Sequence, residues 1–254
     1  MPSWKRSRFE PGGGDAHVAL AVFTDTRVTG LSVSISRHGV PEDAASIPAR
    51  MDDLTRDQAP QLFTVLDDEN VLALASDEGI DTRRLRQATH QVLIVLSIPD
   101  PEDCAYLQLA WGFARAVCDS VPVYGVLDRH AVRWWSSDRL LARSNRGLDP
   151  TSELSTLLLT DPDPRFGHIC HTRGMRKFGR PDLVICGLSL QHGSMAADLL
   201  HALAVPMVQG QRLRPGVRLS QDWFQGTCEA YLPRKNAPDL ALDNHALVLL
   251  PDAG

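Results

Sequence analysis

Residues 91–98 form an almost uninterrupted apolar run, and a helical pattern follows it closely. The run reads QVLIVLSI and is rich in β-branched residues, which predicts a strand that is covered on both faces. Pro99–Asp103 then interrupts it, and Pro101 suits the first turn of a helix. Beyond this break, apolar residues recur at the spacing of a helix that packs on a core. They are Leu107, Ala110, Trp111, Ala114, Val117 and Cys118.

The rest of the first half contains shorter patterns. His17–Thr24 predicts a buried strand, and the alternation of residues 31–36 predicts a half-buried one. We further expect a short helix over 58–66, a strand over 70–76 and a strand over 121–127.

Proline, glycine and asparagine accumulate over residues 143–164, which predicts a connector with a domain boundary near 149. The second half then predicts strands at 166–171, 183–188, 227–232 and 245–250, with a helix over about 194–204. The expected fold is α+β, with two small sheet-and-helix modules whose sheets are mixed or antiparallel. Residues 1–14 are expected to be a flexible tail, residues 15–148 the first module and residues 149–254 the second.

Several classes of protein are disfavoured by the sequence. The longest clean apolar run has six residues, far short of the roughly 20 that cross a membrane, and the N-terminus lacks the apolar core of a secretory signal. The five cysteines are odd in number and form no C-x-x-C pair, so we expect reduced thiols in a cytoplasm. The net charge of −5 makes nucleic acid an unlikely partner. Arginine supplies 23 of the 26 basic residues, which is typical of a GC-rich bacterial genome.

One stretch resembles a known family. Residues 166–216 contain T-x-G-M, then F-G-x-P-D-L, an apolar strand that ends G-L, paired leucines and G-x-x-L-x-P-G. This order is similar to the bacterial "domain of unknown function 4262" family, with a weaker continuation to about 234. The resemblance implies a small α/β module and assigns no activity. Asp182 replaces the more usual Glu, and Pro206 falls where the family continues a helix, so we expect that helix to kink or end there.

The motif also has a direct physical interpretation. Gly174 allows a sharp turn at positive φ, and Met175 and Phe178 are spaced to anchor one helical turn. Gly179 and Pro181 then end that turn. On this interpretation each position sets the direction or the packing of the chain.

Charge is unevenly distributed along the sequence. Residues 41–81 contain eleven acidic and two basic side chains, whereas residues 165–218 contain eight basic and two acidic ones. The basic stretch is either a surface for an acidic protein or a small anionic ligand, or the complement of the acidic stretch within the chain. The residues we predict to bind are Arg173, Arg176, Lys177, Arg180, Arg212 and Arg214.

Catalytic signals are weak. The sequence lacks G-x-S-x-G, the P-loop motif and a G-x-G-x-x-G after a strand. His171, Asp182 and Cys170 are the catalytic candidates, but strand neighbours point to opposite faces, so Cys170 and His171 do not form a nucleophile–base pair. The cysteines and histidines lack the paired spacing of a zinc site, and we expect no metal and no cofactor.

The sequence therefore favours a non-catalytic binding or regulatory module, by analogy of the stress, defence or toxin-neutralising type. The alternative is a small-molecule enzyme with a site around His168, His171, Arg173 and Asp182. A pocket that joins those four side chains would favour the enzyme. Separated or outward side chains would favour the binding module.

Overall fold

The computed structural model describes residues 4–143, 147–230 and 244–251. The chain divides into two compact units. Unit 1 contains Met1–Lys5 and Ala16–Leu148, and unit 2 contains Arg6–Asp15 and Asp149–Gly254. The division at 148/149 coincides with the boundary expected from the sequence. Both units combine helices with a sheet, so the α+β prediction is confirmed.

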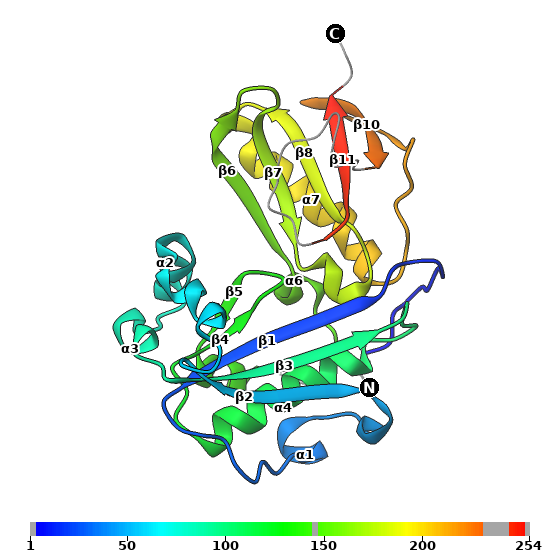
Figure 1. The fold of residues 1–254 in the computed structure, drawn as a ribbon. Helices are drawn as coiled ribbons and strands as arrows, with labels where there is room; N and C mark the ends of the chain where they lie inside the picture. Colours follow the sequence, from blue (N-terminus) through cyan, green and yellow to red (C-terminus); the bar gives the residue numbers. More distant parts are fainter. Residues whose placement is uncertain (1–3, 144–146, 231–243, 252–254) are drawn as a thin grey trace. The chain divides into compact units, whose positions relative to one another are not determined.

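Unit 1 is built on a five-stranded antiparallel sheet in the order β2-β3-β1-β4-β5 (Figure 1). The strands are β1 (Ala16–Thr24), β2 (Ala49–Thr55), β3 (His90–Ile98), β4 (Gly125–Asp128) and β5 (Arg133–Trp135). Strand β3 and the long helix after it are where the sequence predicts them. The α-helices are α1 (Ile35–His38), α2 (Glu69–Asp77), α3 (Thr82–Arg86), α4 (Ala105–Ser120) and α5 (Ser137–Ala142).

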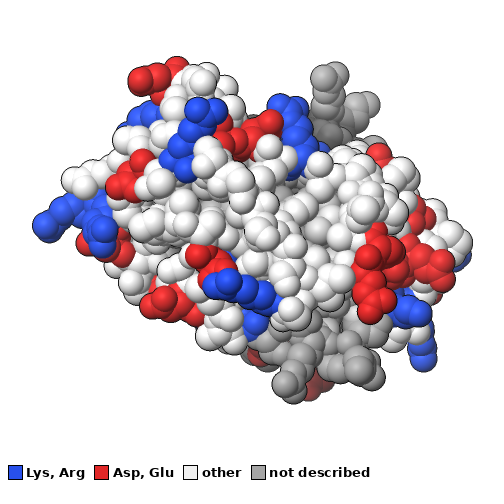
Figure 2. Space-filling view, turned by 90° about the horizontal axis from the view of Figure 1, so that it is seen from below, with Lys and Arg blue, Asp and Glu red and all other residues white. Residues whose placement is uncertain are grey.

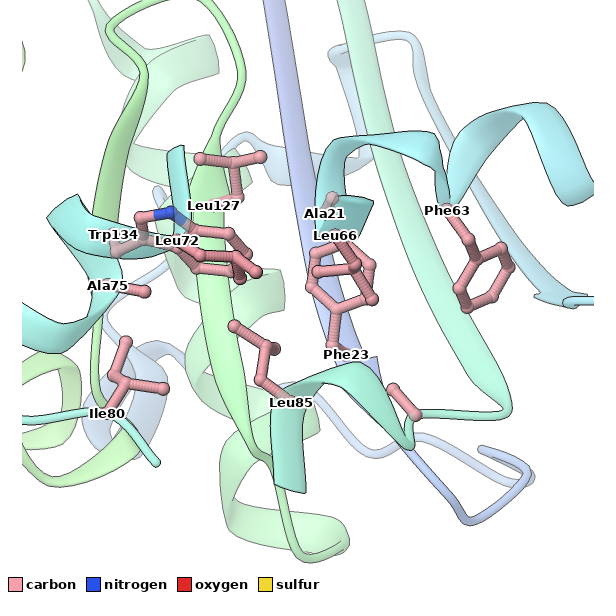
Figure 3. Packing of buried hydrophobic residues seen from close by; sticks show 11 residues of the cluster. Ala21, Phe23, Phe63, Leu66, Leu72, Ala75, Ile80, Leu85, Leu127 and Trp134 are labelled. Carbon is pink, nitrogen blue, oxygen red and sulfur yellow. The ribbon is translucent and has the colours of Figure 1, made fainter. Parts of the chain in front are cut away.

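Helix α4 packs on β1 and β3, and a second apolar layer covers the opposite face of the sheet. Figure 3 shows this second layer, in which Phe23 and Trp134 of the sheet meet Leu66, Leu72 and Leu85 from the helical segments. The rings of Phe23 and Trp134 lie 5.6 Å apart between centroids. The sheet of unit 1 is therefore covered on both faces, as the apolar run 91–98 predicts.

Two predictions in unit 1 are wrong. Residues 70–76 are helical because Asp68 caps the amide N–H groups of Asn70 and Val71, and a short apolar run does not distinguish a strand from a buried helix. The alternating residues 31–36 do not form a strand, and Ser34 instead caps the short helix α1.

Unit 2 contains a six-stranded mixed sheet in the order β6-β7-β8-β11-β10-β9, in which only β8 and β11 are parallel. Helix α7 (Gly193–Val208) packs on β6, β7 and β8. The helix α6 (Pro150–Glu153) precedes the sheet. The strands are β6 (Ser155–Asp163), β7 (Gly167–Arg173), β8 (Asp182–Leu188), β9 (Arg218–Gln221), β10 (Phe224–Ala230) and β11 (Ala246–Pro251).

Three further expectations are corrected in unit 2. The second part of the predicted connector is strand β6, whose leucines pair with β7. Helix α7 continues through Pro206 to Val208. The expected flexible tail instead follows unit 2 as an extended strap over residues 6–15, with hydrogen bonds from Arg8 N to Gln209 O (3.1 Å) and from Glu10 N to Gly210 O (3.0 Å).

The turn at Gly174 has the geometry that the sequence predicts. Its φ is 102°, in the region that favours glycine, and it starts the 3-10 helix η4 (Met175–Phe178). Met175 and Phe178 are both fully buried. Gly179 follows at φ 61° and ends the turn, which leads the chain directly into a pocket.

Candidate functional site

The strap, the turn after η4, the loop after α7 and the chain before β11 enclose a pocket of about 380 Å³ in unit 2. Its lining combines three positively charged or titratable side chains, Arg180, Arg212 and His245, with an apolar remainder. None of the described lining residues is acidic. The other residues of the lining are Gly12, Gly13, Gly14, Gly179, Pro181, Met207, Leu213, Pro215, Ala230, Ala246 and Leu247.

The strap forms one wall of the pocket because glycine lets its backbone come close to unit 2. A Cβ on Gly12 would lie 2.7 Å from the Nη1 atom of Arg212, and Gly12 has φ 88°. The amide of Gly14 donates to the carbonyl of Gly179 at 2.9 Å. A larger side chain at Gly12 would displace the guanidinium group from its position beside the strap.

Arg180 is the most deeply buried cation of the lining, with 2% exposure. Its guanidinium group donates to the carbonyl oxygens of Gln211 (3.3 Å), Gly179 (3.3 Å), Glu10 (3.1 Å) and Gly210 (3.0 Å). Arg180 thus joins the strap to the loop after α7. It supports the pocket and brings a positive charge to its wall, and it does not form part of an exposed basic surface.

Arg212 and His245 are the accessible polar groups. Arg212 is exposed, and its Nη1 donates to the carbonyl of Pro11 at 3.1 Å. That bond uses one of the five guanidinium N–H donors. His245 is also exposed, and its carbonyl accepts from the Asp182 amide at 2.8 Å. Both side chains therefore lie at the pocket in exposed positions from which they can donate to a ligand.

The other predicted binding residues do not line this pocket. Lys177 is fully buried and forms an ion pair with the equally buried Glu153 at 2.8 Å. Arg173 and Arg176 are partly buried, and Arg214 is exposed in the loop after α7. The predicted basic surface is therefore corrected. The structure places Arg180 and Arg212 together at the pocket and buries Lys177 elsewhere.

Acidic residues of the 41–81 stretch find cations within unit 1. Asp52 pairs with Arg50, Asp53 with His90, Glu69 with Arg86, and Glu78 with Arg139. On the face seen in Figure 2, blue and red side chains are interspersed rather than gathered into two opposite fields. Part of the acidic stretch is thus paired with cations of its own unit.

The four residues of the predicted enzyme site do not line either pocket described in unit 2. His168 lies near the start of β7, and its buried Nδ1 has no hydrogen-bond partner among the described residues. His171 is 5% exposed, and burial lowers its pKa. Arg173 ends the same strand. Burial also raises the pKa of the Cys170 thiol to about 11, so at neutral pH Cys170 is protonated and a poor nucleophile.

Asp182 is a buried carboxyl group that holds two segments together. Its Oδ1 accepts from the Thr172 hydroxyl (3.1 Å) and the Met175 amide (3.4 Å), and its Oδ2 accepts from Asn244 Nδ2 (2.9 Å). Burial raises its pKa to about 7, although these hydrogen bonds oppose the rise. Since Asn244 Nδ2 also donates to the carbonyl of Arg180 at 2.9 Å, Asp182 fixes the backbone under the pocket from within the protein.

Two contributors to the pocket, the glycine strap and His245, were not among the binding residues predicted from the sequence. From the sequence, Gly12–Gly14 is expected to be a hinge in the flexible tail, because the run has no lysine partner. The positive φ of Gly12 and the hydrogen bond from the Gly14 amide to the carbonyl of Gly179 depend on the folded unit 2, and no local sequence pattern predicts them. His245 is the first residue of a predicted strand, and no local pattern marks it as a binding residue.

No family model, no curated protein and no solved structure matches this chain. No helix within the described ranges has both the length and the apolar character that crossing a membrane requires.

Proposed function

We propose that unit 2 is a binding module for a small anionic molecule, which it holds in the pocket beside the glycine strap. The observation that carries the proposal is the lining itself: Arg180, Arg212 and His245 face an apolar remainder, without an acidic side chain among the described lining residues. A positive wall favours a carboxylate or phosphate group, and the apolar wall favours an organic body that carries it. The volume, about 380 Å³, suits a small molecule.

A small ligand fits these observations better than an acidic protein. The buried Lys177 and Arg180 are beyond the reach of a macromolecular surface, whereas a small anion can approach Arg212 from the solvent. The proposed enzyme around His168, His171, Arg173 and Asp182 has no support from a shared pocket. We therefore propose that unit 2 has a non-catalytic binding or regulatory role, in the bacterial cytoplasm.

The family resemblance remains part of the proposal. Gly179, Pro181, Leu213 and Pro215 belong to the motif that resembles the "domain of unknown function 4262" family, and all four line the pocket. This placement supports a binding role for the motif in addition to its role in chain direction.

Isothermal titration tests the proposal with phenyl phosphate and benzoate as probes and neutral benzamide as the uncharged reference. We expect both anions to bind and benzamide to bind at least about tenfold more weakly, because a hydrogen bond to a charged group contributes about 1.5–3 kcal/mol.

Two arginine variants locate the site. Arg212→Gln should weaken the binding of the anions by about tenfold or more. Arg214→Gln is the matched control, because Arg214 is equally exposed and does not line the pocket. Equal losses in the two variants, or equal binding of benzamide, would contradict the proposal.

A further inference from the structure

The described residues of unit 1 include the aspartate–histidine pairs Asp119–His38 and Asp53–His90. The two pairs differ in whether the second ring nitrogen of the histidine has a hydrogen-bond partner. His38 lies at the end of α1 and contacts Asp119 of α4 through Nε2 at 3.3 Å. His90 begins β3 and contacts Asp53 of β2 through Nδ1 at 2.9 Å. The residue types are the same, so the surroundings decide what each imidazole can do.

His38 is a structural histidine. Its Nδ1 accepts from the Ser34 amide at 3.0 Å, which leaves Nε2 to carry the proton that it donates to Asp119. Only 6% of its side chain is exposed. Both ring nitrogens are occupied, and neither has a lone pair available to an incoming molecule.

His90 has one occupied nitrogen and one open nitrogen. Strand register sets Thr55 opposite His90 and Asp53 opposite Val92, so Asp53 and His90 lie on the same face of neighbouring strands. The second oxygen of Asp53 accepts from the Val28 amide at 2.7 Å, which fixes the carboxylate. The side chain of His90 is 18% exposed, and within the described part of the chain its Nε2 has no hydrogen-bond partner.

The carboxylate determines the tautomer of His90. A carboxylate accepts hydrogen bonds, so the neutral imidazole places its proton on Nδ1 and its lone pair on Nε2. The same carboxylate also stabilises the positive charge that develops on the ring when Nε2 forms a new bond. Orientation and charge stabilisation thus both favour reaction at Nε2.

We infer that Nε2 of His90 is a nucleophile for acyl transfer from a small neutral ester. It attacks the carbonyl carbon, the ester C–O bond breaks, and the alcohol leaves as its anion with the bonding electron pair. The Asp53 carboxylate balances the charge of the acyl-imidazolium until water attacks the acyl carbon. The water supplies the hydroxyl group of the carboxylic acid, its other proton ends on the alkoxide to give the alcohol, and the C–N bond breaks to restore the free imidazole. A neutral donor suits this site because the Asp53 carboxylate repels a phosphoryl dianion.

Site-resolved acylation of the full chain at pH 8 tests the inference. Diethyl pyrocarbonate is the neutral acyl donor, and mass spectrometry measures the rate of modification at each histidine. We expect His90 to react faster than His245, which is more exposed but has no carboxylate partner in the described structure, and His38 to react slowest. A rate at His90 equal to or below that at His245 would overturn the inference.

Asp53→Asn separates activation from packing, because the two explanations predict opposite signs. A positioning carboxylate predicts slower acylation of His90 in the variant. A purely structural carboxylate predicts faster acylation, since its loss would loosen β2 and expose the ring. Asp53 acts through His90 and is therefore a positioning residue.

Hydrolysis of p-nitrophenyl acetate measures the complete cycle. His90→Gln should lower the protein-dependent rate by about tenfold, near the lower end of what positioned imidazoles contribute. His201→Gln is the control, because His201 lies on α7 in unit 2 and should leave the rate unchanged. An unchanged rate in folded His90→Gln, verified by thermal melting, would refute the assignment.

Discussion

The arginine–carboxylate ion pairs described in unit 1 lie at its surface, whereas unit 2 contains a lysine–glutamate pair that is fully buried. In unit 1, Arg86 and Glu69 pair with 47% and 78% of their side chains exposed. In unit 2, Lys177 and Glu153 pair with 0% exposed, and Arg180 and Asp182 are nearly as deep. The comparison teaches that a basic stretch of sequence is not by itself a basic surface, because folding assigns some of its cations to internal support.

Breaking the buried pair should produce the largest effect on stability. Lys177→Ala leaves the Glu153 carboxylate buried without its ion-pair partner, and removal of one partner from a buried pair costs about 3–5 kcal/mol. We expect the free energy of unfolding of unit 2 to fall by that amount in urea. The matched variant in unit 1, Arg86→Ala, should cost at most about 1 kcal/mol, because exposed pairs contribute little. Similar losses in both variants would remove the contrast between the units.

The pH dependence of stability sharpens the same comparison through Asp182. Its pKa rises from 3.8 to about 7 on folding, so between these values the folded state binds a proton that the unfolded state has lost. The free energy of unfolding therefore decreases as pH rises from about 4 to about 7. Burial lowers the pKa of His171 below its ordinary value of 6.5, so the unfolded state binds a proton there more readily than the folded state does. Through His171, the free energy of unfolding therefore decreases as pH falls through about 6.5 and below.

The difference between the wild type and Asp182→Asn isolates the carboxyl group. The stability of the variant relative to wild type should increase by a few kcal/mol between pH 4 and pH 8, since each pKa unit corresponds to about 1.4 kcal/mol. Chemical unfolding at a series of pH values measures it. A difference that does not change with pH would show that Asp182 titrates normally.

Attachment of the strap should be sensitive to one glycine. Gly210 has φ 109°, and a Cβ there would overlap the carbonyl of Arg8, so Gly210→Ala should cost about 1–3 kcal/mol and release the strap to proteolysis. Gly216→Ala is the control variant. Gly216 has φ 85°, so an alanine there has a similar backbone penalty, but no atom lies within 4 Å of the added Cβ and there is no clash. Equal protease sensitivity in both variants would argue against a close-packed strap.

The sequence predicts the elements whose patterns are long and regular. β3 and α4 lie where the apolar run and the helical stripe predict them, and the turn at Gly174 has the expected positive φ. The errors have a common cause. Residues 70–76 and 155–163 are short segments whose structure depends on a cap or on a partner strand, and neither is visible in a local pattern.

The candidate site was only partly predictable for the same reason. Arg180 and Arg212 were identified from charge, but charge does not reveal that Arg180 donates to four carbonyl oxygens while Arg212 stays exposed. The strap and His245 lie far apart in sequence and share the pocket only through the fold. The histidine pairs of unit 1 likewise join distant parts of the sequence. His90 and Asp53 are 37 positions apart, and His38 and Asp119 are 81 positions apart.

Amide NMR of the full chain during titration with phenyl phosphate tests the central claim most directly, because it locates the ligand without altering the protein. The pocket predicts progressive shifts in the amides of Gly12, Gly13, Gly14 and Leu213 and in His245, with small changes in the amides of unit 1. Titration with benzamide should leave the same signals in place. Shifts confined to residues outside the pocket lining, or the same shifts with benzamide, would contradict the assignment of this pocket as an anion-binding site.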